Sequence, residues 1–93
     1  MEKSVRELWK LIQRILVIAV EGMDEERLPP ERLTAEALGV SNALRANVLR
    51  MMFNGGLLEG RLIEGKELLA INVSPTLDGL QCLEWIRELL RDG

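Results

Sequence analysis

The stretch "LTAEALGVSNALRANVL", residues Leu33 to Leu49, decides the predicted fold, because it contains two short helical patterns that meet at a glycine. The first helix is expected from about Glu31 to Leu38, and the second from about Asn42 to Asn54. Between them, Gly39 permits a left-handed turn, and Ser41 supplies a side-chain oxygen that caps the second helix. The pattern therefore predicts a helix-turn-helix corner.

The segment before this corner, from Ser4 to about Glu21, is predicted to form a strongly apolar helix that stops at Gly22. Its apolar residues exceed what one stripe can hold, so the helix must be covered on more than one side. The C-terminal helix or a second subunit is expected to supply that cover. The stripe holds Val5, Leu8, Ile12, Ile15, Leu16 and Ala19, and the apolar residues outside it are Trp9, Leu11, Val17, Ile18 and Val20.

The segment after the corner predicts a β-hairpin with a four-residue loop from Glu64 to Glu67. A two-residue loop at Glu64-Gly65 is the alternative, but it mixes apolar and polar side chains on the two faces. The longer loop places five aliphatic side chains on one face. Its expected pairs are Ile63 with Leu68, Leu62 with Leu69, Gly60 with Ile71 and Leu58 with Val73, and the shared face holds Leu58, Leu62, Leu69, Ile71 and Val73.

The last helix is expected to begin within "SPTLDGL", residues 74–80, with Ser74 or Thr76 as its N-cap. Gly79 starts an apolar stripe there, although a glycine inside a helix costs about 1 kcal/mol in helix propensity. We therefore expect another backbone to approach closely at Gly79. The whole order, α-α-α-β-β-α within a single domain of residues 1–93, predicts an α+β, mostly helical fold, namely a winged helix-turn-helix with a C-terminal helix.

The composition narrows the classes of function. Acidic residues number 15 against 12 basic ones, and a net charge of −3 opposes nonspecific attraction to phosphates. The chain has no histidine, which excludes imidazole metal ligands and histidine-based acid–base catalysis. Its one cysteine, Cys82, is expected to be a buried core thiol in a protein of the reducing cytoplasm. The apolar run from Leu11 to Val20 is too short to span a membrane. We expect neither an enzyme nor a bound metal or cofactor.

Two stretches carry a resemblance to known proteins. "VLRMMFNGGLLEG", Val48 to Gly60, looks like the end of the recognition helix and the entry to the first strand of winged-helix proteins. "PTLDGLQCL", Pro75 to Leu83, resembles the Thr-Leu-x-Gly-Leu-x-x-Leu pattern that opens the last helix of the YjcQ-like phage and prophage proteins. The resemblance covers about Leu8 to Leu90. The resemblance implies the fold of a small winged-helix protein. It implies no specific function, since the biochemical role of that family is largely unassigned.

A helix-turn-helix reads bases with its second helix, so that helix holds the first candidate site. Asparagine can pair with adenine, and arginine with guanine or a phosphate. Arg45 is expected at the edge of a core side formed by Leu44, Val48, Leu49 and Met52, with its guanidinium directed outward as a further DNA contact. The hairpin offers Arg61 and Lys66 as phosphate contacts. The positions expected to face the DNA groove are Ser41, Asn42, Ala43, Ala46, Asn47 and Arg50.

Two functions follow from these residues. The first is a DNA-binding protein, such as a transcriptional regulator, that dimerises through Leu11, Ile18, Trp85 and Leu89. The second is a protein-interaction module that has the fold but does not bind DNA, as the net charge and the glutamates beside the hairpin tip favour. A continuous positive stripe joining Arg45, Arg50, Arg61 and Lys66 would favour DNA. Basic residues neutralised by Glu59, Glu64 and Glu67 would favour a protein partner.

Overall fold

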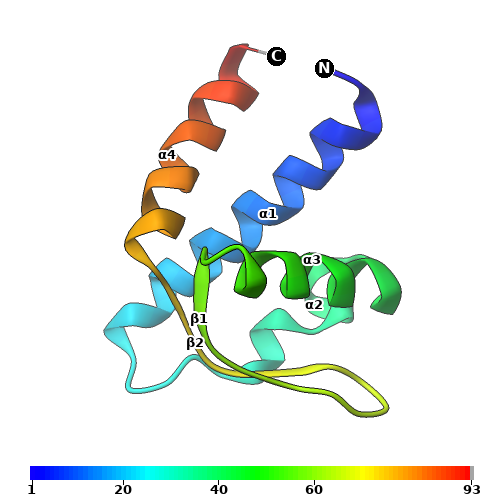
Figure 1. Ribbon diagram of the computed structural model, residues 1–93, viewed down its shortest axis with the longest axis vertical. Helices are drawn as coiled ribbons and strands as arrows, with labels where there is room; N and C mark the ends of the chain where they lie inside the picture. The colour runs from blue at the N-terminus through cyan, green and yellow to red at the C-terminus, as the bar shows by residue number, and fades with distance from the viewer. Residues whose placement is uncertain (93) are drawn as a thin grey trace.

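The computed structural model describes residues 1–92, and this part of the chain contains four α-helices and one two-stranded antiparallel sheet. This small α+β, mostly helical layout is consistent with a winged helix (Figure 1). The elements are α1 (Lys3–Glu21), the 3-10 turns η1 (Gly22–Asp24) and η2 (Pro30–Leu33), α2 (Ala35–Leu38), α3 (Asn42–Asn54), β1 (Leu58–Ile63), β2 (Leu69–Pro75) and α4 (Leu77–Asp92).

Helix α1 is the centre of the core. Helix α4 runs beside α1, and the sheet packs against the C-terminal half of α1 (Figure 1). Because this cover comes from the same chain, Leu11 and Ile18 are buried within the single chain. The prediction that these two residues form a dimer interface is therefore wrong. No helix within residues 1–92 combines the length and the apolar character that crossing a bilayer requires.

Helix α1 ends at Glu21 with Gly22 as its C-cap, as predicted. Gly22 has a φ of −73° and continues into η1, so its left-handed freedom is not used. A Cβ atom at Gly22 would lie 2.7 Å from the Cδ1 atom of Leu28, whose side chain is buried. Gly22 therefore leaves room for the Leu28 side chain to pack against the end of α1.

The helix-turn-helix corner has the predicted local signals. Gly39 adopts a φ of +70°, and the Ser41 hydroxyl accepts a hydrogen bond from the backbone N–H of Leu44. The helix expected from Glu31 to Leu38 is instead split at Thr34, whose backbone is extended. The Thr34 hydroxyl accepts a hydrogen bond from the Ala37 N–H, so it caps a new short helix and the earlier turn ends there.

The hairpin is present, but the predicted register is wrong. Five residues, from Glu64 to Leu68, separate the strands, and Leu68 is buried. Asn72 adopts a φ of +54°, and with Val73 it lies opposite Gly60 as a β-bulge that exchanges the inward and outward sides of β2. The inward residues of β2 are consequently Ala70, Val73 and Pro75, whereas Leu69 is exposed. The observed pairs are Leu58 with Pro75, Glu59 with Ser74, Arg61 with Ile71, Leu62 with Ala70 and Ile63 with Leu69.

Helix α4 begins after Thr76, whose hydroxyl accepts a hydrogen bond from the Gly79 N–H and donates one to the Gly56 carbonyl. This selects Thr76 over Ser74 as the cap. The close backbone approach predicted at Gly79 is confirmed, because a Cβ atom there would collide with the carbonyl oxygen of Leu57. Glycine at this position thus lets α4 lie directly against the chain that enters β1.

Candidate nucleic-acid interface

Arg45 belongs to the interior of the protein, which corrects its assignment as an outward-facing DNA contact. Its side chain is 6% exposed, and its Nε donates a hydrogen bond to the carbonyl of Leu33. Its Nη1 donates to the carbonyl of Leu68, at 2.6 Å. Burial lowers the pKa of this guanidinium, and the charge of Glu67 opposes that change. Arg45 therefore connects the helix-turn-helix corner to the hairpin loop.

Arg50 lies at the surface of α3, but it is paired within the chain. Its Nη2 and Nε donate to the two carboxylate oxygens of Glu64, at 2.8 and 3.2 Å. This hydrogen-bonded pair raises the pKa of Arg50 and lowers that of Glu64. The planar guanidinium fork that could bind guanine or a phosphate is thus occupied by a carboxylate of the hairpin.

The hairpin retains two exposed cations, Arg61 and Lys66, and neither takes part in an ion pair within residues 1–92. The exposed glutamates Glu59, Glu64 and Glu67 are on the same hairpin. With Arg45 buried and Arg50 paired, the continuous positive stripe that would favour DNA is not formed.

The outward face of α3 is more apolar than expected. Ser41, Asn42, Ala43 and Asn47 are exposed, as a groove-facing surface requires, although the Ser41 hydroxyl is used as the helix cap. Leu44 and Met51 are also exposed, and they were missed as surface residues. Their separation of seven residues places them on one side of the helix. That spacing was the available signal, and the expected place of Leu44 in the core is corrected.

Leu44 also lines a groove between α3 and the N-terminal half of α1. The groove has a volume of about 520 Å³. Its one charged lining residue, Glu7, is paired with Lys10 on the same helix. The groove is therefore a mostly apolar and nearly neutral continuation of the α3 surface. Its lining residues are Ser4, Val5, Glu7, Leu8, Leu11, Val40 and Leu44.

Cys82 and the carboxylates are the side chains that could take part in chemistry. Cys82 is half-buried, and burial raises the pKa of its thiol, which disfavours the thiolate. Within residues 1–92, no group of three or more Cys, Asp and Glu side chains is arranged to hold a metal ion.

No protein-family model, curated protein or solved structure matches this chain. The resemblance to the YjcQ-like family therefore stays a prediction, and the function has to be argued from the surfaces described above.

Proposed function

We propose that this protein is a protein-interaction module whose partner docks on the outward face of α3 and the adjoining groove beside α1. The observation that carries this proposal is the internal use of both α3 arginines. Arg45 holds two backbone carbonyls, and Arg50 is paired with Glu64. A helix that read DNA would present such side chains to the duplex.

Electrostatics also favour a protein partner over DNA. The affinity of a protein for DNA comes largely from cations that neutralise phosphates and release counterions. The face formed by α3 and the hairpin offers Arg61 and Lys66 as unpaired cations, close in sequence to three glutamates. The whole chain carries a net charge of −3, which adds to the repulsion of phosphates.

The exposed apolar side chains give a partner something to bind. Leu44 and Met51 project from α3, and Leu44 continues into the apolar groove that includes Val5 and Leu8. An amphipathic helix that inserts apolar side chains into a groove is a common mode of protein recognition. Because the groove is nearly neutral, we expect this binding to depend little on salt.

Site-specific photocrosslinking tests the proposal. A benzophenone amino acid in place of Met51 should give a discrete adduct with one protein in the native host. The same amino acid in place of the exposed Glu88, on α4, serves as the matched control and should give none. The variant Leu44→Ser should remove the Met51 adduct. Equal labelling from both positions, or labelling that Leu44→Ser does not change, would contradict a specific α3 surface.

DNA binding is the second candidate, and the exposed Asn42 and Asn47 together with the unpaired Arg61 and Lys66 favour it. In that case the protein would act as a dimer through Trp85 and Leu89, which are not fully buried. A fluorescence-anisotropy titration with duplex DNA at low salt separates the candidates. Saturable binding that the double variant Arg61→Gln/Lys66→Gln abolishes would establish DNA binding and overturn the first proposal.

A further inference from the structure

A second apolar groove lies at the opposite end of α1, where η1 approaches the first turn of α4. The groove has a volume of about 600 Å³. Leu77 is 84% exposed, the largest value for any large hydrophobic side chain within residues 1–92, and Met23 is 58% exposed. Such exposed apolar side chains around one groove are typical of an interaction surface. The lining residues are Met23, Gly56, Glu59, Pro75, Thr76, Leu77, Asp78 and Leu80, and they define the Met23 groove.

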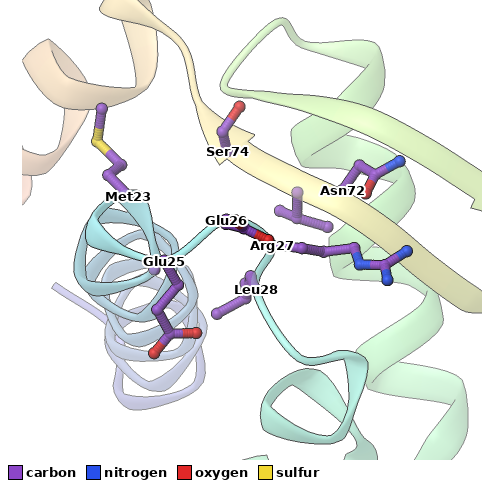
Figure 2. A pocket seen from close by; sticks show the side chains of 9 residues that line it. Met23, Glu25, Glu26, Arg27, Leu28, Asn72 and Ser74 are labelled. Atoms are coloured by element: carbon purple, nitrogen blue, oxygen red, sulfur yellow. The ribbon is translucent and has the colours of Figure 1, made fainter.

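Two carboxylates line the Met23 groove without compensating ion pairs. Glu59 and Asp78 line it, and an acidic run of three residues follows Met23 directly in sequence. None of these five carboxylates forms an ion pair within the part of the chain that the structure describes. Arg27 extends along β2 beside Asn72, whereas Met23 extends toward the beginning of α4 (Figure 2). The apolar groove therefore has a negative rim.

We propose that the Met23 groove binds a cationic amphipathic segment of a partner protein. A large apolar side chain of that segment inserts between Met23, Leu77 and Leu80, and its flanking lysines or arginines lie against the carboxylates of the rim. The apolar contacts supply most of the affinity, and the charges supply speed of association and selectivity. The unbranched thioether of Met23 adapts to apolar side chains of different shapes.

The charge of the rim selects this occupant over a second copy of the chain. Each copy has a net charge of −3, and facing copies of the same groove would bring the unpaired Glu59 and Asp78 of both copies together. A basic segment removes this repulsion by neutralising the rim.

This inference goes beyond the proposed function, because it assigns a second surface with different chemistry. Helix α1 has 19 residues and is therefore about 28 Å long. It separates the neutral groove beside α3 from the Met23 groove, so the protein can hold two partners at once. Binding at the Met23 groove weakens with salt, whereas binding at α3 depends on it little.

Fluorescence anisotropy with defined peptides tests the inference. The probe is a labelled 14-residue helical peptide made of leucine and lysine, arranged with one apolar face. Its two controls are the peptide with glutamate in place of every lysine and a scrambled lysine peptide without an apolar face. The lysine peptide should bind at 50 mM salt, more weakly at 300 mM salt, and at least tenfold more tightly than either control.

Variants locate the peptide on the molecule. Leu77→Ser should raise the dissociation constant about tenfold, because it removes one apolar anchor. Glu59→Lys should raise it severalfold at 50 mM salt and less at 300 mM salt. Ile63→Ser is the matched apolar control, since Ile63 is 39% exposed and lies on the hairpin outside both grooves, and Glu88→Lys is the matched charge control. Both controls should leave binding unchanged. Circular dichroism verifies the fold, and Met23→Ser replaces Leu77→Ser if that variant unfolds.

Three results would overturn the inference. The first is equal binding of the lysine and glutamate peptides. The second is a loss of binding with Met51→Ser but not with Leu77→Ser or Met23→Ser, which would place the peptide on α3. The third is a wild-type dimer in sedimentation that Leu77→Ser dissociates, which would make a second copy the occupant. None of these depends on the Met51 crosslinking result, so a failure of the proposed function is recognised separately.

Discussion

Replacing Arg45 by methionine tests whether this arginine holds the corner to the hairpin. Methionine has a similar length and is apolar, but it has no donor for the carbonyls of Leu33 and Leu68. A buried carbonyl without a donor costs about 1–3 kcal/mol. Part of this loss is offset, because the variant no longer buries a guanidinium charge. We therefore expect Arg45→Met to lower the free energy of unfolding by about 2–4 kcal/mol.

Thermal and urea unfolding measure this loss. In a domain of this size, 1 kcal/mol shifts the midpoint by about 4–8 °C, so Arg45→Met should unfold roughly 8–32 °C below wild type. Circular dichroism follows all helices, while fluorescence follows Trp9 and Trp85, whose rings meet edge to face at 5.0 Å between α1 and α4. Coincident transitions would show that the contact stabilises the whole domain.

The controls separate this structural role from a surface role. Arg50→Met changes an exposed arginine on the same helix and should leave the midpoint almost unchanged. Arg45→Lys keeps the charge but lacks the planar fork that reaches two carbonyls, so its midpoint should lie between those of wild type and Arg45→Met. If Arg45→Met is as stable as wild type, or more stable, the assigned contacts do not hold the fold together.

Three further predictions concern single contacts. Gly79→Ala should lower the thermal midpoint by the equivalent of about 2 kcal/mol, because overlap with the Leu57 carbonyl outweighs the gain in helix propensity; an unchanged midpoint would disprove the close approach. Arg50→Gln should raise the pKa of Glu64, which carboxyl NMR measures. In wild type, the lowered pKa of Glu64 contributes stability at pH values above its unfolded-state pKa, and this stability is lost as the pH falls through its folded-state pKa. The variant should lose this dependence of stability on acid pH. Iodoacetamide should alkylate Cys82 slowly at pH 8 and rapidly in urea, since burial raises the pKa of the thiol in the folded protein. The stability linked to this pKa shift is present below the unfolded-state pKa of Cys82 and declines as the pH rises toward its folded-state pKa. Fast alkylation of the folded protein would contradict the burial of the thiol.

Most of the secondary structure could be predicted because its signals act over a few residues. Gly39 needs only its own backbone freedom to make the left-handed turn, and Ser41 caps a helix three residues away. Gly79 was recognisable because a glycine within an apolar helical stripe needs a packing reason. The candidate site was harder to predict. The helix-turn-helix template assigns positions of the second helix to DNA contacts, but it does not show which of these side chains pair with other parts of the same chain.

The sequence by itself determined the first and last helices, the corner and the Ser41 cap, because hydrogen bonds between near neighbours and the allowed backbone angles of each residue fix them. Only the tertiary structure decided the hairpin register, in which the left-handed Asn72 reverses the faces of β2. It also decided the use of the arginines, since Arg45 meets a carbonyl 23 residues away and Arg50 a carboxylate 14 residues away. Such partners depend on how whole elements pack, and local sequence patterns carry no record of that packing.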